Sequence, residues 1–365
     1  MEGVERLMKD LLFYKGKRVF VTGHTGFKGA WLCRILVNAG AEVTGYALLP
    51  PTEPNLFSLA ELESSMNSVI GDIRDLESLW SAFDAAQPEI VFHMAAQPIV
   101  RTSYEQPVYT YETNVMGTVN LLECVRRCDS VRSVVNVTTD KVYRNNEWEW
   151  GYRETDELCG FDPYSNSKSC SELVTESYIN SFLRKKGVAV STMRAGNVIG
   201  GGDFARDRII PDCVRAVTEN RPIIVRNPYS VRPYQHVLEP LYAYLLVGQE
   251  QYTKTELAGQ YNIGPGDDDC ITTGELAQMF CDSWGDSACW ESHYVGGPHE
   301  ANFLKLDCAK IRKTFAWKPH WNARRAIEET VSWSKEWIAG KQIAVFMDHQ
   351  IREFFSDYSG EEAQL

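Results

Sequence analysis

A strand, a glycine-rich turn and a helix near the start of the chain constrain its fold more than any other feature. The apolar strand Arg18–Thr22 is followed by glycines at 23, 26 and 29 and by a helical pattern over Ala30–Asn38. Such glycines let the backbone turn tightly and approach a pyrophosphate, whose charge suits the helix N-terminus. The pattern predicts a dinucleotide site made of Gly23, His24, Thr25, Gly26, Phe27, Lys28 and Gly29.

This loop departs from the commonest dinucleotide fingerprint in two ways. Its spacing is G-x-x-G-x-x-G, and the second strand, Ala41–Tyr46, is not followed by an Asp or Glu that could bind the adenine ribose. We expect His24 or Lys28 to take that role. A glycine turn that only joins strand to helix is the alternative interpretation.

Alternating strand and helix patterns continue through the first half of the chain. Further strands are predicted at Ser68–Ile70, Glu89–His93, Arg132–Thr138 and Ala189–Arg194, and crossover helices at Leu76–Ala86, Val108–Arg127 and Tyr164–Lys185. This order indicates an α/β fold: a doubly wound, parallel Rossmann-type sheet with a smaller mixed α/β C-terminal substrate domain. We expect residues 1–195 to bind the dinucleotide and residues 196–365 mainly the substrate, with segments near 234–264 returning to the first domain.

Residues at the predicted strand ends define where a ligand should lie. In open parallel sheets, ligands bind beyond the carboxyl ends of the strands. Gly23, Asp72, Ala95, Thr139 and Asn197 all follow predicted strands. We therefore expect these five residues to lie along one edge of the sheet.

Tyr164 and Lys168 form the most reactive pair in the sequence. They are four residues apart, so on a helix they share one face with a rise of roughly 6 Å between them. A nearby ammonium favours phenolate, and we expect Lys168 to lower the pKa of Tyr164 and make it a proton acceptor. An accidental helical pair is the alternative.

Composition agrees with an intracellular enzyme. The 365 residues carry a formal net charge of −12, which argues against nucleic acid or anionic membranes as general partners. No apolar run reaches membrane-spanning length, and residues 1–17 lack a signal-peptide core, so we expect a cytoplasmic protein. The ten cysteines are scattered without zinc-site spacing, so free, mostly buried thiols and no metal are expected.

Several motifs together resemble one known family. They are Thr22–Gly29, His93-Met94-Ala95-Ala96-Gln97, Asn114, Thr139-Asp140 and Tyr164-x-x-x-Lys168. This set is similar to the extended short-chain dehydrogenase/reductases that act on nucleotide sugars, over nearly the whole chain. The resemblance implies NAD as cofactor, bound by the glycine loop with Asp72, Ile73, Ala95, Ala96, Gln97, Asn114, Tyr164 and Lys168.

Within that family the chain resembles the 4,6-dehydratases acting on CDP-glucose. The motifs that carry this are Thr22–Gly29, Pro50-Pro51-Thr52, Thr139-Asp140-Lys141 and the segment 232–237. Related dehydratases for dTDP-glucose and GDP-mannose carry Glu where this chain has Lys141. Some UDP-N-acetylglucosamine dehydratases also lack Glu at the position of Lys141, so these enzymes stay open as an alternative. Nucleotide-sugar epimerases and a binding protein without activity are two further alternatives.

The resemblance implies a sequence of three steps. Tyr164 takes the C4 hydroxyl proton while hydride passes to NAD, water is then lost across C5 and C6, and hydride returns to C6. Asp140 gives a proton to the departing hydroxyl, which needs a raised pKa from burial. Lys141 is the C5 base, an electrostatic helper or a structural partner of Asp140, and Thr139 donates to the C4 oxygen. The alternatives are a helix cap for Asp140 and a buried strand hydroxyl for Thr139.

Substrate and partner contacts are also implied. Asn197, Arg208 and Arg232 are expected to meet the diphosphate and hexose, with surface salt bridges as the alternative for the arginines. His299 resembles a sugar-pocket residue, with a cap or core-polar role equally open. The helices Val108–Arg127 and Tyr164–Lys185 would pair across a two-fold axis into the four-helix bundle of a homodimer, or else pack within one subunit. A role in making deoxysugars for lipopolysaccharide O-antigen is implied as well.

Overall fold

The centre of the structure, a computed structural model, is a seven-stranded parallel sheet with the strand order β11-β6-β5-β4-β1-β2-β3. The structure describes residues 11–285, 288–293 and 304–361. The strands are β1 (Arg18–Thr22), β2 (Glu42–Ala47), β3 (Asn67–Ile70), β4 (Ile90–His93), β5 (Ser133–Val137), β6 (Ala189–Ala195) and β11 (Gln260–Ile263). Strand order reverses beside β1, which creates the crevice where ligands of such sheets bind.

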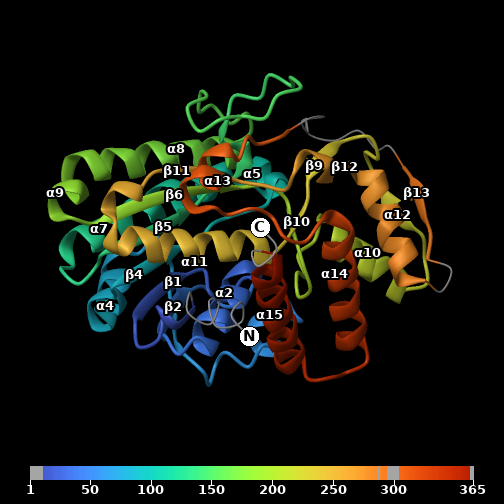
Figure 1. Ribbon diagram of the computed structural model, residues 1–365, viewed down its shortest axis with the longest axis horizontal. Helices are drawn as coiled ribbons and strands as arrows, with labels where there is room; N and C mark the ends of the chain where they lie inside the picture. Colours follow the sequence, from blue (N-terminus) through green and yellow to red (C-terminus); the bar gives the residue numbers. More distant parts are fainter. Residues whose placement is uncertain (1–10, 286–287, 294–303, 362–365) are drawn as a thin grey trace.

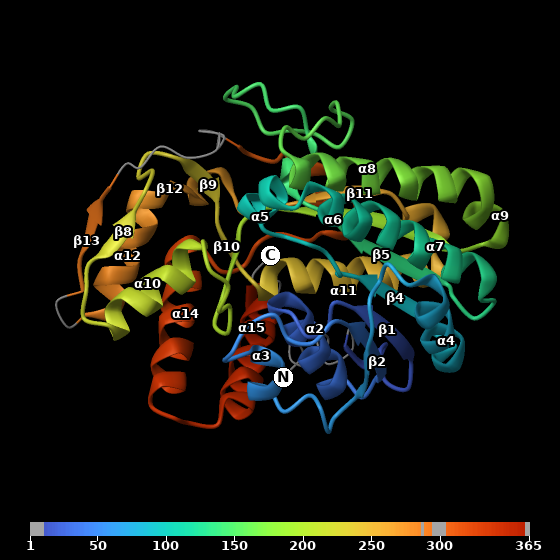
Figure 2. The ribbon, with the colours of Figure 1, turned by 180° about the vertical axis from the view of Figure 1, so that it is seen from behind.

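Helices cover both faces of the sheet, as the strand–helix alternation predicts (Figures 1 and 2). One core cluster joins the sheet to α2 (Phe27–Asn38) and α11 (Leu238–Thr253), and another joins it to α4 (Leu76–Ala86) and α7 (Gly117–Arg127). The helix α8 (Pro163–Tyr178) packs beside α7 on the second face. The predicted α/β doubly wound fold is confirmed.

A smaller group of short strands and helices lies beyond the end of the sheet (Figure 1). Its strand pairs are β7 (Val198–Ile199) with β10 (Gln235–His236), β9 (Val231–Pro233) with β12 (Cys270–Thr272), and β8 (Ile223–Val225) with β13 (Trp290–Ser292). Apolar residues of α10 (Ile209–Thr218), α12 (Thr273–Trp284) and α14 (Ala323–Ile338) form a separate core here. The helix α15 (Ile343–Glu361) packs on α14.

Short elements complete the connections. They are α3 (Leu56–Leu59), α5 (Val100–Glu105), α6 (Pro107–Tyr111), α9 (Arg184–Lys186), α13 (Ala309–Phe315), the π-helical turns η1 (Glu112–Met116) and η3 (Ile179–Leu183), and the 3-10 turns η2 (Asp140–Val142), η4 (Thr255–Leu257) and η5 (Asp267–Asp269).

Three predicted helices differ from the observed ones. The helix predicted over Tyr164–Lys185 is divided into α8, the π turn η3 and α9. The helix predicted over Val108–Arg127 is divided into α6, η1 and α7, because five residues adopt the wider π turn. The helix predicted from Ala30 begins instead at Phe27, so Gly29 lies in its first turn. A Cβ at Gly29 would lie 2.1 Å from the carbonyl oxygen of Gly23, so only glycine permits this early start.

The helix α8 is held to the sheet by polar contacts as well as by packing. Asn136 on β5 donates to Ser171 (3.2 Å) and Thr175 (2.9 Å), and Ser171 also pairs with Thr118 of α7 (3.0 Å). All four side chains are buried. Directional contacts of this kind fix the rotation of α8 more closely than apolar packing alone.

Two of the sequence-based expectations concern the chain as a whole. Within the described residues no helix combines the length and apolar character needed to cross a bilayer, and no His, Cys, Asp or Glu side chains gather into a metal-binding group. The ten cysteines are free, six of them buried and one exposed. The expectation of free, mostly buried thiols is confirmed.

Candidate active site

The glycine loop after β1 brings backbone, rather than side chains, to the crevice. Gly23 has a φ of +78°, and a Cβ there would lie 2.8 Å from the backbone nitrogen of Ala95. Gly26 precedes α2 without a side-chain cap, so the first N–H groups of the helix keep their hydrogen-bonding capacity. Close backbone approach and an uncapped helix N-terminus fit a dinucleotide pyrophosphate.

His24 does not fit the ribose role expected from the sequence. Its ring has no exposed surface, and Nε2 lies 2.7 Å from Oγ of Ser68. Gly45 makes room for it, since a Cβ there would lie 2.3 Å from the ring. Burial lowers the pKa of His24 to about 4, so the ring is neutral. These contacts favour a structural role, joining the loop to β2 and β3.

Lys28 lies close to the predicted catalytic residues Lys168 and Asp140, whose charges act on it. Burial, together with the charges of Lys168 and Arg208, lowers the pKa of Lys28 to about 7, and the charge of Asp140 opposes this shift. Its Nζ lies 5.9 Å from the ring centroid of Tyr244 on α11. The interactions with Lys168 and Asp140 place Lys28 on the reactive side of the crevice, which does not favour ribose binding.

Beyond β3, the predicted cofactor residue Asp72 is already engaged. Its carboxylate accepts two hydrogen bonds from Arg74 side-chain nitrogens, at 2.7 and 3.0 Å from Oδ2, and Arg74 also pairs with Glu112. The hydrogen bond from Arg74 lowers the pKa of Asp72. The next residue, Ile73, is buried.

The loop after β4, which contains Ala95, Ala96 and Gln97, is held in place by Thr22 and Asn114. Oγ1 of Thr22 accepts from the backbone nitrogen of Ala95 at 3.1 Å. Asn114, in the π turn η1, accepts from the Gln97 nitrogen (2.8 Å) and donates to the Gln97 carbonyl (3.1 Å) and to Ser167 (2.9 Å). Asn114 therefore connects this loop to α8, the helix that carries Tyr164 and Lys168.

Thr139 and Asp140 follow β5, and both side chains are buried. The Thr139 hydroxyl caps η2 and donates to Oδ1 of Asp140 at 2.9 Å. The helix cap is thus Thr139, not Asp140 as the alternative reading held. Oδ2 of Asp140 has no hydrogen-bond partner among the described residues and lies 3.3 Å from the position of a Cβ on Gly196.

Asp140 has the electrostatic environment of an acid. Burial raises its pKa, opposed by the charge of Lys141, the Thr139 hydrogen bond and Arg232. The raised pKa expected from the sequence is confirmed. Lys141 is half-buried, close enough for its charge to act on this carboxyl group.

Tyr164 and Lys168 share the buried face of α8, as their spacing predicts. The predicted effect on the pKa is wrong, however: burial raises the pKa of Tyr164 to about 12, against smaller opposing effects of Thr139 and Arg208. Lys168 donates instead to the carbonyl of Val137 at 3.1 Å, and burial lowers its pKa to about 8. Desolvation of the phenolate exceeds the stabilisation by cations because the hydroxyl is buried.

The two predicted arginines lie at the same crevice. Arg208 pairs with Asp203 at 3.3 Å, but its charge also acts on Tyr164 and Lys28. Arg232 on β9 is buried, and its charge acts on Asp140. A surface salt bridge does not describe Arg232. Asn197 is part-exposed between β6 and β7, and His299 lies outside the described residues.

Three buried polar side chains next to this site were not identified from the sequence. Glu172 and Arg194 form a buried ion pair at 2.9 Å next to the end of β5, and Tyr244 is buried within electrostatic reach of Tyr164. The spacing of Tyr164, Lys168 and Glu172 at four-residue intervals could have identified Glu172. Arg194 and Tyr244 carry no comparable sequence signal.

A family comparison decides where the chain belongs. The model described as GDP-mannose 4,6 dehydratase matches residues 20–330. The chain belongs to this family. Membership of the GDP-mannose 4,6 dehydratase family agrees with the extended short-chain dehydrogenase/reductase resemblance seen in the sequence.

Individual relatives narrow the relationship within that family. CDP-glucose 4,6-dehydratase of Salmonella typhimurium is 50% identical over 355 residues, covering 96% of this chain and 99% of the relative. The UDP-glucose 4-epimerase of Thermus thermophilus, solved in complex with NAD, superposes with a TM-score of 0.76 at 26% identity, covering 87% of this chain and 98% of that structure. The dTDP-glucose 4,6-dehydratase of Bacillus anthracis, at 22% identity, a TM-score of 0.74 and coverage of 87% and 96%, shares the fold.

Proposed function

We propose that the chain is an NAD-dependent lyase that converts CDP-glucose to CDP-4-keto-6-deoxyglucose. The observation that carries this proposal is a buried carboxyl group with a raised pKa, Asp140, beside Tyr164 and Lys168. An epimerase needs the tyrosine and lysine but no acid for a leaving hydroxyl. The full-length relationship to the Salmonella CDP-glucose 4,6-dehydratase supports CDP-glucose as substrate over UDP-N-acetylglucosamine.

The glycine loop and the NAD-bound Thermus relative support NAD as cofactor. Gly23, Gly26 and the N-terminus of α2 would hold its pyrophosphate, and the loop after β4 and the α8 residues Tyr164 and Lys168 would lie at its reactive end. Bound NAD would supply reversible hydride transfer, for the oxidation at C4 and the reduction at C6, and would bring a positively charged ring to the site. No acid follows β2 to bind the adenine ribose, and the contacts of His24 described above do not favour that role for it.

The chain's own residues then handle the protons. Tyr164 accepts the proton of the C4 hydroxyl, and Thr139 donates a hydrogen bond to the same oxygen. Because burial raises the pKa of Tyr164, it needs positive charge beyond that of Arg208 to act as a base at neutral pH.

Elimination uses the residues after β5. Once C4 is a ketone, C5–H becomes acidic because the carbanion is delocalised as an enolate. Asp140 protonates the departing C6 hydroxyl, and Lys141, directly beside it, is proposed to take the C5 proton. Arg208, Arg232 and Asn197 are proposed to hold the diphosphate and hexose at the same crevice.

The division into domains follows from these roles. We propose that residues 1–195 bind NAD and residues 196–365 mainly the nucleotide sugar, with the segment 234–264 contributing to the first domain. Packing of α11 on β5 and β6 and pairing of β11 with β6 support this assignment. The free thiols support work in a reducing compartment, for which we propose the cytoplasm. A role in deoxysugar synthesis, such as that for O-antigen, is proposed from the 4-keto-6-deoxy product.

The substrate proposal is tested by product mass. Purified protein and NAD are incubated separately with CDP-glucose, UDP-glucose, dTDP-glucose and UDP-N-acetylglucosamine. We expect the loss of one water from CDP-glucose, at a rate at least about tenfold above that for the others. Loss of water from UDP-N-acetylglucosamine alone would favour the alternative dehydratase, and a product of unchanged mass would favour an epimerase.

We propose further that two copies pair through α8 and the segment α6–η1–α7, the two regions that the sequence predicts as long helices. The helices α5, α6 and α8 lie side by side in Figure 2, and the π turns η1 and η3 contact α8. Exposed apolar side chains on these five elements are Tyr104, Val108, Tyr111, Met116, Leu173 and Phe182. Such a surface is unusual on a monomer, and a second copy of the same helices would cover it as a four-helix bundle.

Sedimentation over a dilution series tests the dimer. Leu173 is 54% exposed on this surface and Ile338 is 48% exposed at the end of α14. We expect Leu173→Asp to raise the dimer dissociation constant at least about tenfold, because it places a charge in an apolar interface, while Ile338→Asp leaves it unchanged. Sedimentation of the parent protein as a monomer at every concentration would contradict the proposal.

A further inference from the structure

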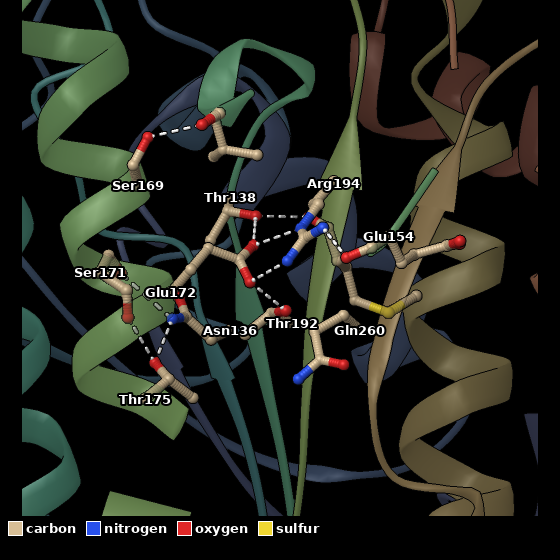
Figure 3. A network of polar contacts seen from close by, with 12 residues as sticks. Asn136, Thr138, Glu154, Ser169, Ser171, Glu172, Thr175, Thr192, Arg194 and Gln260 are labelled. Atoms are coloured by element: carbon tan, nitrogen blue, oxygen red, sulfur yellow. Dashed lines mark hydrogen bonds and ion pairs between the residues drawn. The ribbon is translucent and has the colours of Figure 1, made fainter. Parts of the chain in front are cut away.

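Glu172 is buried one turn after Lys168 on the same face of α8. Its Oε1 accepts from the Thr138 hydroxyl (2.5 Å) and from Nε of Arg194 (3.0 Å). Its Oε2 accepts from the Thr192 hydroxyl (2.6 Å) and from Nη2 of Arg194 (2.9 Å). Figure 3 shows the carboxylate between these three partners. Both oxygens are therefore satisfied, as a buried carboxylate requires.

These contacts attach α8 to the end of β5 at two consecutive residues. Lys168 holds the carbonyl of Val137 (3.1 Å), and Glu172 holds the side chain of Thr138. Thr139 and Asp140 follow directly. The helix that carries Tyr164 is thus hydrogen-bonded to the chain immediately before Thr139 and the proposed acid, Asp140.

Arg194 extends the network towards the edge strand β11. Besides its two bonds to Glu172, Nη1 donates to the Tyr143 hydroxyl (2.8 Å) and to the carbonyl of Glu154 (3.0 Å). The Tyr143 hydroxyl in turn donates to Asn262 on β11 (2.6 Å). Arg194 is fully buried and bidentate, so it fixes the orientation of the Glu172 carboxylate.

We propose that Glu172 is a positioning residue for dehydration: by holding Thr138 while Lys168 holds Val137, it fixes Asp140 relative to Tyr164, and its negative charge balances the cations behind the tyrosine. The proposal rests on the proposed function. Neither Glu172 nor Thr138 needs to touch the substrate for this role.

The charge of Glu172 acts on the reacting pair through Lys168. Burial lowers the pKa of Lys168, and Glu172 raises it. Removing that charge favours loss of a proton from the Tyr164–Lys168 pair, whichever of the two groups releases it. The acidic limb of a kcat profile should then move to lower pH. Other charged or titratable groups facing the pair or Glu172 are Lys28, His93, Asp140, Tyr143, Asp162, Arg194, Arg208 and Tyr244.

The hydrogen bond is tested without changing the charge. Thr138→Val removes the hydroxyl that donates a hydrogen bond to Glu172 close to Asp140 in the chain. Thr192→Val is a matched control, because it removes a hydrogen bond of similar length to Glu172 from the neighbouring strand. We expect Thr138→Val to lower kcat for dehydration of CDP-glucose about tenfold or more with KM within about twofold, and Thr192→Val to change kcat less than about twofold. Equal kcat values in the two variants would overturn the positioning role.

The charge is tested with Glu172→Gln, which keeps the shape of the side chain. We expect the acidic limb of its kcat profile at lower pH than in the parent, whereas Thr138→Val keeps the parent limb. A purely structural loss would lower kcat at every pH without moving the limb, and that result would overturn the electrostatic part. If Glu172→Gln does not fold because Arg194 loses its counter-charge, the threonine pair still decides the positioning role.

Failure of this inference and failure of the proposed function give different results. If the parent protein removes no water from CDP-glucose, the proposed function is wrong. If the parent is active while Thr138→Val and Thr192→Val behave alike, the proposed function stands and Glu172 is not a positioning residue.

Discussion

Tyr164→Phe is expected to abolish dehydration, with a loss of about 10²- to 10⁴-fold or more in kcat. The change removes the hydroxyl that accepts the C4 proton and keeps the buried ring, so the packing of α8 is preserved. No C4 oxidation should then occur. Product mass and the absorbance of reduced cofactor in a single turnover measure the two stages.

A matched control is available at Tyr14. This ring is also buried, and its hydroxyl donates to the Leu245 carbonyl at 2.6 Å, outside the site. Tyr14→Phe should lower stability by about 1 kcal/mol and leave kcat near that of the parent. Turnover by Tyr164→Phe within about tenfold of the parent would show that another group accepts the proton, and Lys28, which has a pKa of about 7, would be the next candidate.

Asp140→Asn is expected to separate oxidation from elimination. The amide has the shape of the carboxyl group but cannot protonate the leaving hydroxyl, so we expect reduced cofactor to form and persist while loss of water slows about 10²- to 10³-fold. The oxidation step serves as an internal control that the variant is folded and binds substrate.

The pH dependence follows from the direction of the Asp140 pKa. Burial raises that pKa, so the protonated acid persists to higher pH than for an ordinary aspartate, and elimination should slow as pH rises through it. The asparagine variant should lack this limb. Elimination by Asp140→Asn at the parent rate would remove the acid role and leave Asp140 as a structural partner of Thr139 and Lys141.

Much of the fold could be predicted from the spacing of apolar residues and from the glycine and polar residues that end each strand or helix. The strand and helix patterns place six of the sheet strands within about two residues, because buried parallel strands are continuous apolar runs that end at glycine or polar residues. The π turn around Asn114 could not be read, since its wider winding follows from contacts of Asn114 with Gln97 and Ser167, far apart along the chain.

The chemistry was readable as residue types but not as ionisation states. The spacing of Tyr164 and Lys168 predicts one helical face, which is observed. The direction of the Tyr164 pKa was predicted wrongly, because the dominant cause is burial of the tyrosine in the folded chain, and sequence spacing shows only the neighbouring charge.

By itself the sequence determined the layered sheet, the glycine loop and the residue types of the site, because local spacing sets helix faces and strand ends. Only the tertiary structure decided that Lys28 turns towards the acid, that His24 is buried against Ser68, and that Glu172 and Arg194 stand behind Thr138. These outcomes depend on burial and on partners distant in sequence. Desolvation and buried ion pairing exist only once the sheet and helices have packed.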